Sequence, residues 1–127
     1  MKSDATMRVL IVEPGKAPRE VVIAHTLEAM QAVVGGPIQA VYPFEEPVAL
    51  ICNDESKSLG LPWNRMLRDF SGEIYDIIAG TFFLCAAPKD SASFEGLTEN
   101  QVQAYSKRFA HPEYFLRTSQ GLMVLVL

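Results

Sequence analysis

The chain has 127 residues, 49% of them hydrophobic and 20% charged, so we expect one globular domain over residues 1–127 and no long disordered region. The net charge of −4 argues against bulk binding to nucleic-acid backbones, which requires many lysine and arginine side chains. No apolar run reaches roughly 18 residues, so we expect no membrane-spanning segment.

The N-terminus and the cysteines indicate the compartment. Residues 1–6 are polar, and we expect them to be flexible and not to form a signal peptide. Cys52 and Cys85 lie inside apolar runs, which is typical of buried, reduced thiols. The sequence has no Cys/His cluster, so it predicts no metal site and no cofactor. A cytoplasmic protein is the simplest interpretation.

The first third of the chain predicts a hairpin followed by a helix. Residues 7–14 and 19–24 are apolar, β-branched runs separated by a Pro/Gly turn, as in a β-hairpin. A helix is expected over residues 27–34, because its apolar residues recur at helical spacing. Thr26 can cap its start, and Gly35 can end it.

The middle of the chain predicts strands around one polar loop. The runs 38–44 and 47–53 are expected to be strands that could form a second hairpin. Residues 54–62 have the composition of a loop, and 63–70 could hold one or two helical turns. The most apolar stretch, 73–87, is expected to be a strand that bulges, or approaches another backbone, at its internal glycine.

The last third predicts a helix and a terminal strand. Thr98 and Gln101 form a T-x-x-Q capping box, and the helix that it starts is stopped by Pro112. The closing run 121–127 is expected to be a strand in a central or covered place of the sheet. Together the elements predict a single α+β domain, with a mixed or mostly antiparallel sheet of about six strands and two main helices packed on it.

Several phrases of the sequence, in this order, resemble a known family: "TLEAMQAVVGGPIQAVY", "ICNDESKSLGLPWNR", "DIIAGTFFL" and "LTENQVQAYSKRFAHPEYF". They are similar to a domain-of-unknown-function family of small uncharacterised proteins, carried by phages, plasmids and other bacterial mobile elements. The resemblance extends over about residues 8–116. It implies an accessory protein in the cytosol of a bacterial host, and it supplies no activity and no catalytic residue.

The region 53–69 is the strongest candidate for a binding surface. It gathers Asn and Arg side chains around the only tryptophan, a set that suits a nucleotide-like ligand. The expected ligand-binding or partner-binding residues are Asn53, Lys57, Trp63, Asn64, Arg65 and Arg68. In the alternative interpretation, Trp63 covers the edge of the sheet, while Asn64 and Arg65 hold the loop through hydrogen bonds to the backbone.

Other chemistry has weaker support in the sequence. Asp69, Glu73 and Asp76 could take part in acid–base or metal chemistry, but in a strand Asp76 would face away from Glu73. Lys107 and Arg108 lie beside an aromatic stripe, which is more typical of a helix packed on a core than of a nucleic-acid site. No catalytic residue is therefore assigned.

These features predict a non-catalytic binding protein in one of two forms. It binds a host protein, for example a component of host defence, or it holds a small nucleotide-like molecule between protomers. The alternative is a small enzyme that acts on a nucleotide or nucleic-acid related substrate through the polar residues of 53–76. An exposed edge strand, or the apolar C-terminal strand, could also pair between chains in a homodimer.

Overall fold

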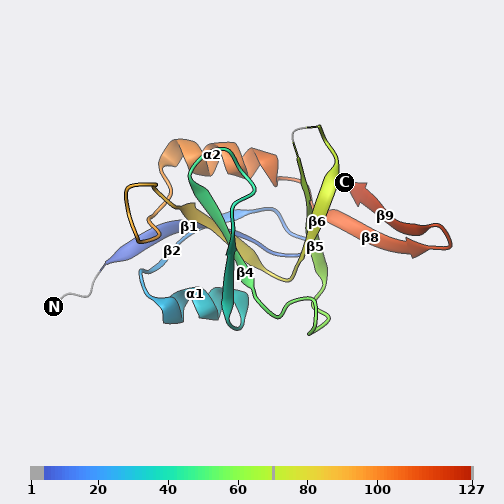
Figure 1. Cartoon of the computed structure of the whole chain (residues 1–127), viewed down its shortest axis with the longest axis horizontal. Helices are drawn as coiled ribbons and strands as arrows, with labels where there is room; N and C mark the ends of the chain where they lie inside the picture. Colours follow the sequence, from blue (N-terminus) through green and yellow to red (C-terminus); the bar gives the residue numbers. More distant parts are fainter. Residues whose placement is uncertain (1–4, 70, 127) are drawn as a thin grey trace.

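Nine strands and two helices make up the part of the chain that this computed structural model describes, residues 5–69 and 71–126 (Figure 1). The main sheet has five antiparallel strands in the order β2-β1-β7-β4-β3. These strands are β1 (Thr6–Val12), β2 (Arg19–Ala24), β3 (Ile38–Val41), β4 (Val48–Asn53) and β7 (Phe82–Ala86). The expected α+β composition and the antiparallel pairing are thus present.

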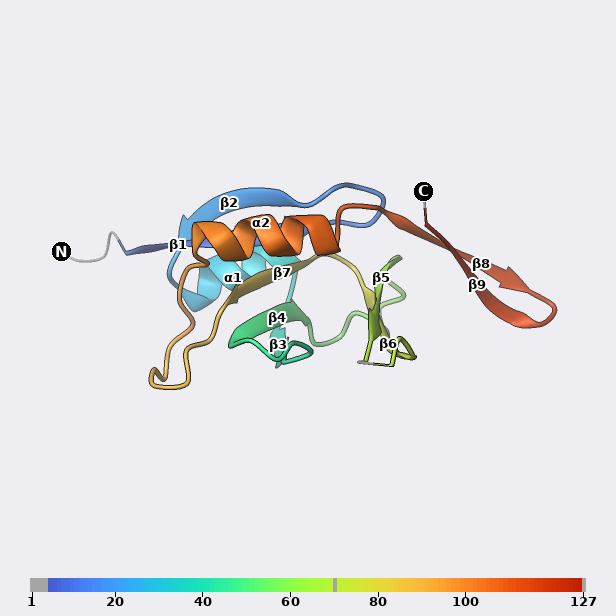
Figure 2. The ribbon, with the colours of Figure 1, turned by 90° about the horizontal axis from the view of Figure 1, so that it is seen from above.

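Two further hairpins lie beside one end of the main sheet, away from the N-terminus (Figures 1 and 2). Strands β5 (Trp63–Arg68) and β6 (Ile74–Ala79) form the first, and β8 (Glu113–Thr118) and β9 (Gly121–Val126) form the second. Strand β8 contacts β5 near the start of the second hairpin.

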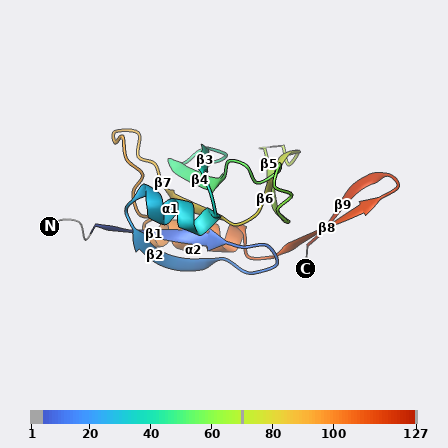
Figure 3. The same cartoon turned by 90° about the horizontal axis from the view of Figure 1, so that it is seen from below.

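Helix α1 (Leu27–Val34) begins and ends as predicted and covers one face of the main sheet (Figure 3). Thr26 Oγ1 accepts a hydrogen bond of 3.1 Å from an amide of the first turn. Gly35 ends the helix with a φ of +80°, which glycine adopts at little cost because it has no Cβ. Met30 and Val34 are buried against residues of β1, β4 and β7.

Helix α2 (Glu99–Arg108) lies on the opposite face of the main sheet, so each face of the sheet has a core (Figure 1). The predicted capping box is present, because Thr98 and Gln101 exchange hydrogen bonds of 2.9 and 3.1 Å. Val102 and Tyr105 are buried in the second core, which also contains side chains of the β5–β6 hairpin. Neither helix of the described chain has the length and apolarity that a membrane crossing requires.

Two predictions for the middle of the chain are wrong. Residues 63–68 form strand β5 and not helical turns, because they pair with β6. The run 73–87 is not one strand: it breaks at Gly80, whose φ is +77°, into two strands that belong to different sheets. The Gly80 amide donates a hydrogen bond of 2.6 Å to the carbonyl oxygen of Pro62. This break, together with the unexpected strands β5 and β8, explains why the described chain has nine strands and not about six.

The two ends of the chain also differ from expectation. Residues 1–4 lie outside the described residues, but Thr6, expected in a flexible tail, begins strand β1. Strand β9 was expected to be covered, yet four of its six residues are large apolar side chains between 41% and 56% exposed. The reason is topological, because β9 pairs with β8 in a hairpin outside the main sheet. Leu127, in the same predicted strand, lies outside the described residues.

Candidate functional site

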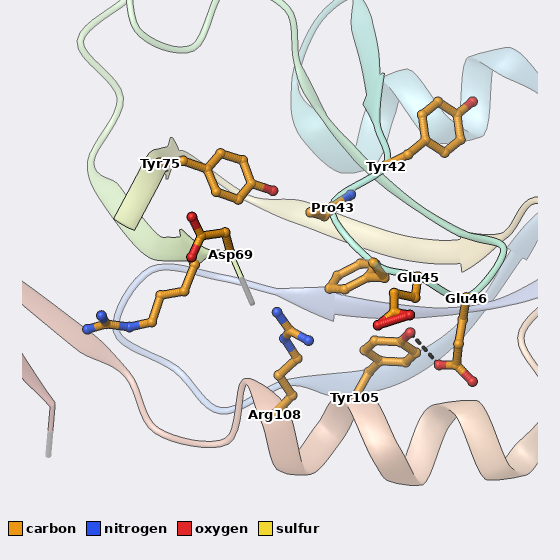
Figure 4. A pocket seen from close by; sticks show the side chains of 10 residues that line it. Tyr42, Pro43, Glu45, Glu46, Asp69, Tyr75, Tyr105 and Arg108 are labelled. Carbon is orange, nitrogen blue, oxygen red and sulfur yellow. Dashed lines mark hydrogen bonds between the residues drawn. The ribbon is translucent and has the colours of Figure 1, made fainter. Parts of the chain in front are cut away.

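A pocket of about 700 Å³ opens between helix α2, the β3–β4 connection and the β5–β6 hairpin (Figure 4). Its volume falls within the range of roughly 300–1,000 Å³ that is typical of small-molecule sites. Four aromatic rings, two guanidinium groups and three carboxylates line it. The lining residues of this aromatic pocket are Tyr42, Pro43, Phe44, Glu45, Glu46, Arg68, Asp69, Tyr75, Tyr105 and Arg108.

The floor of the aromatic pocket is a packed group of rings with a cation above it. The rings of Phe44 and Tyr105 lie 4.8 Å apart between centroids, and Phe44 also meets Phe109 edge-on at 6.3 Å. Arg108 places its Cζ atom 4.8 Å from the centroid of the Phe44 ring, a cation–π contact. The guanidinium of Arg108 points toward the middle of the pocket (Figure 4). Stacking therefore holds this cation in place while its N–H donors stay available.

A short hydrogen bond joins the helix wall to the β3–β4 connection. Tyr105 Oη donates to Glu46 Oε1 at 2.6 Å (Figure 4). Burial raises the pKa of Tyr105 well above its usual value, and the bond to Glu46 raises it further. The phenol therefore stays protonated and keeps donating, which fixes residues 42–46 against α2.

The opposite wall is held by bonds within the β5–β6 turn. The Asp69 carboxylate accepts from the hydroxyl of Ser71 at 2.8 Å and from the amides of Ser71 and Glu73 at 2.9 and 3.0 Å. These hydrogen bonds lower the pKa of Asp69, and the bond from the Ser71 hydroxyl has the largest effect. Arg68 Nη1 donates to the carbonyl oxygen of Gly72 at 2.7 Å. Tyr75 is half exposed on this wall and presents its ring to the pocket (Figure 4).

Asn64 and Arg65, the expected centre of the binding surface, are both completely buried. Asn64 Nδ2 donates to the carbonyl oxygens of Val12 and Gly80, each at 2.9 Å. Arg65 donates to Asn64 Oδ1 at 2.8 Å and to the Phe109 carbonyl oxygen at 3.0 Å. Burial lowers the pKa of Arg65, and the nearby Glu113 carboxylate opposes this shift. Both residues lie in strand β5 with their polar groups bound to the backbone, as in the alternative interpretation, and not on an exposed binding surface.

Asn53 and Lys57 also make contacts within the protein. Asn53 is buried, and its amide group donates to the Val34 carbonyl oxygen at 3.2 Å, which joins the end of β4 to the end of α1. Lys57 is exposed and forms an ion pair of 2.6 Å with Asp76. Neither residue lines the aromatic pocket.

Trp63 and Arg68 line two different pockets. Trp63 is half-buried, with its ring 6.4 Å from that of Phe115, and it lines a separate hollow of about 360 Å³. Arg68 alone of the six expected residues lines the aromatic pocket. The six residues therefore do not converge on one site.

Sequence reasoning missed most of the aromatic pocket. Tyr42, Phe44 and Tyr75 were predicted only to lie in strands and carried no functional prediction, while Arg108 and its aromatic neighbours were assigned to a core-facing helix. The available signal was the run "YPFEEP" over residues 42–47, which places aromatic and acidic side chains together between two strands. Its partners lie about 30 and 60 residues further along the chain, so only the tertiary structure brings them together.

The cysteines and the acidic residues form no metal-binding group in the described part of the chain. Cys52 and Cys85 are buried free thiols, as expected. Burial raises the pKa of both thiols, that of Cys85 to about 12, so both are protonated at neutral pH.

Comparison with known proteins gives one match. A family model described as Domain of unknown function (DUF3846) matches residues 7–110. The matched part contains both helices and every residue of the aromatic pocket, whereas the β8–β9 hairpin lies beyond it. Neither the curated proteins nor the solved structures provide a match.

Proposed function

We propose a binding function for this chain, which belongs to the DUF3846 family. In this proposal the protein holds a small nucleotide-like molecule in the aromatic pocket and does not convert it. The observation that carries the proposal is Arg108, held over the Phe44 ring with its donors directed into a cavity of about 700 Å³.

Two kinds of recognition support this ligand class. Tyrosine and phenylalanine rings offer flat faces on which a nucleobase stacks. Guanidinium groups donate several hydrogen bonds in one plane, which suits a phosphate. Among the described residues Arg108 makes no ion pair, so a phosphate would not have to displace a carboxylate from it.

The charges of the pocket disfavour a ligand with several phosphates. Three carboxylates and two guanidinium groups line it, so a triphosphate would meet excess negative charge. Glu46 accepts a hydrogen bond from Tyr105, and Asp69 accepts hydrogen bonds from the amides of Ser71 and Glu73 in its own turn. Glu45 remains exposed, and it can accept a hydrogen bond from a base or a ribose.

The enzyme alternative has less support from the geometry. Asp69 and Asp76, two of the three carboxylates considered for catalysis, are each engaged elsewhere, in a turn and in the ion pair with Lys57. The contacts of Asn64 and Arg65 with the backbone likewise favour a structural role for them.

The host and the compartment belong to the same proposal. We place the protein in the cytosol of a bacterial host, as an accessory protein of a phage or another mobile element that counters host defence. This step depends on the resemblance in the sequence. Capture of a nucleotide signal would be one way to act in that setting, and binding of a host protein would be another.

The test is a thermal-shift screen of nucleoside mono-, di- and triphosphates and cyclic nucleotides, followed by calorimetry. A ligand at about 100 times its Kd adds about 2.7 kcal/mol to the free energy of unfolding, which raises the Tm visibly. We expect the rise with a monophosphate and its loss in Arg108→Gln. Lys107→Gln is the matched control, since Lys107 is the exposed neighbour on α2 and lies outside the pocket. No rise with any compound, or equal loss in both variants, contradicts the proposal.

A further inference from the structure

We propose that a hollow beside Trp63 binds a methylated ammonium group. This tryptophan hollow has a volume of about 360 Å³ and lies between the β1–β2 connection, the start of β5 and the start of β8. Its side chains are three aromatic rings, two proline rings and one carboxylate, from Trp63, Tyr114, Phe115, Pro14, Pro62 and Glu113. The aromatic pocket shares none of these residues, so the inference is independent of the proposed nucleotide site.

The aromatic rings offer their faces to a cation. The rings of Trp63 and Phe115 lie 6.4 Å apart between centroids with their planes inclined at 47°, so they are not stacked on each other. Both side chains are half-buried, and Tyr114 is 41% exposed. A cation within about 6 Å of a ring centroid is attracted by the negative face of the ring, most strongly by tryptophan. Several rings around one cavity therefore suit a quaternary or methylated ammonium group.

Glu113 gives the tryptophan hollow a negative charge at a fixed position. Its Oε1 atom accepts a hydrogen bond of 2.8 Å from the Met66 amide, which holds the start of β8 against β5. The other carboxylate oxygen has no hydrogen bond or ion pair in the part of the chain that the structure describes. The lining contains no lysine or arginine, and Lys16, which follows Gly15 in the chain, is not part of it. The charge of the lining thus favours a cation over an anion.

One buried cation near the hollow opposes a bound cation, but its charge is partly compensated. Arg65 is completely buried, and its two terminal nitrogens donate to oxygen atoms of Asn64, Lys16 and Phe109 at 2.8 to 3.3 Å. Those oxygen atoms carry partial negative charge and offset part of the charge of the guanidinium. Among the described residues no ion pair joins Arg65 to Glu113. The Glu113 carboxylate therefore remains available to a ligand.

Methyl groups distinguish the expected ligand from an ordinary lysine side chain. A primary ammonium carries three N–H donors and a strong hydration shell, whereas the lining offers a single carboxylate as charged acceptor. Donors that lose water without gaining a partner cost free energy. A trimethylammonium group has no N–H donor, and its methyl groups can pack on aromatic and proline rings. Such a group occurs on small molecules such as choline and on methylated lysine side chains.

The experiment titrates the full chain with choline and, in a separate arm, with a capped trimethyllysine. Trp63 is the only tryptophan, so its fluorescence reports on one wall of the hollow, and calorimetry gives the Kd. We expect a saturable change with at least one of the two cations. Neohexanol, the uncharged carbon analogue of choline, should bind at least about fivefold more weakly. A response to choline alone assigns a free small molecule as the ligand, and a response to trimethyllysine alone assigns a protein side chain.

Two variants test the charge and the rings separately. Glu113→Gln keeps an oxygen that can accept from the Met66 amide but removes the charge, and it should raise the Kd about threefold to tenfold. Tyr114→Leu replaces an exposed ring by an apolar side chain without a ring and should raise the Kd by a similar factor. Glu55→Gln is the matched control, since Glu55 is exposed outside the hollow, and it should bind like wild type. Melting curves show whether each variant keeps the fold.

Three results would overturn the proposal. The first is the lack of a saturable response to either cation up to about 50 mM, which would mean that the hollow holds no ammonium group. The second is neohexanol binding as tightly as choline, because burial of methyl groups alone would then explain the binding. The third is an equal effect of Glu113→Gln and Glu55→Gln, which would assign the attraction to the net charge of the chain and not to the hollow.

Discussion

Arg65 Nη2 donates a hydrogen bond of 3.0 Å to the carbonyl oxygen of Phe109 and thereby joins strand β5 to the C-terminal end of helix α2. The same nitrogen donates at 2.8 Å to the carbonyl oxygen of Lys16, in the β1–β2 connection. A cation at the end of a helix is favourable, since the free carbonyl groups carry partial negative charge there. Because α2 and the β5–β6 hairpin form opposite walls of the aromatic pocket, this buried side chain helps to set the distance between those walls.

Arg65→Met should destabilise the protein by about 2–4 kcal/mol. The variant keeps the length of the side chain but leaves the carbonyl oxygens of Lys16 and Phe109 buried without their donor. Among the described residues Arg65 Nε has no partner, and the loss of this desolvated donor offsets part of the cost. Urea denaturation measures the change. Arg68→Met, at an exposed position of the same strand, is the control and should change stability by less than about 0.5 kcal/mol.

Asn64→Ala should cost about 1–3 kcal/mol, because two buried carbonyl oxygens, of Val12 and Gly80, lose their donor. Asn64 Oδ1 also accepts from Arg65 at 2.8 Å, so the two residues share one network. The effects of Asn64→Ala and Arg65→Met should therefore be non-additive by at least about 0.5 kcal/mol in a double-mutant cycle. Simple addition of the two effects would show that the residues act separately.

Gly80→Ala should destabilise the protein, because Gly80 forms the break between β6 and β7. Gly80 has a φ of +77°, and a Cβ there would lie 2.8 Å from Leu61 Cδ1. We expect a loss of roughly 1–3 kcal/mol from backbone strain, with a further loss from the displaced leucine. Gly15→Ala is the matched control, because its φ is similar at +75° and its Cβ would meet nothing within 4 Å. A melting temperature equally reduced in both variants would mean that the contact with Leu61 contributes nothing.

The free energy of unfolding should fall as the pH rises from about 9 to about 12. Burial raises the pKa of Cys85 from 9.0 to about 12, so the unfolded thiol loses its proton first. Ionisation then stabilises the unfolded state, and the loss ends once the folded thiol also ionises. Denaturant titrations at several pH values measure this slope. Cys85→Ala should reduce it without removing it, since the pKa of Tyr105 is raised as well.

Much of the local structure could be predicted because it depends on neighbouring residues. Both helices follow from their caps, Thr26 with Gly35 for the first and the Thr98–Gln101 box for the second. The β1–β2 and β3–β4 hairpins follow from apolar runs on either side of Pro/Gly or acidic turns. In each case the interactions that decide the element lie within a few residues along the chain.

The aromatic pocket and the role of Arg65 could not be predicted in this way. The sequence shows an arginine two residues after a tryptophan in a polar region. Such an arginine can bind a ligand or, as it does here, donate to backbone carbonyl groups. Those carbonyl groups lie 49 and 44 residues away along the chain. No local pattern specifies such a distance.

The sequence by itself determined both helices with their caps and the strands of the β1–β2 and β3–β4 hairpins, because backbone propensity and hydrophobic periodicity act over short separations. The tertiary structure alone decided which of those faces are covered. It buried Asn64 and Arg65, split the run 73–87 at Gly80 between two sheets, and left strand β9 exposed. The physical reason is that burial depends on which strands become neighbours, and this choice is made by contacts between distant parts of the chain.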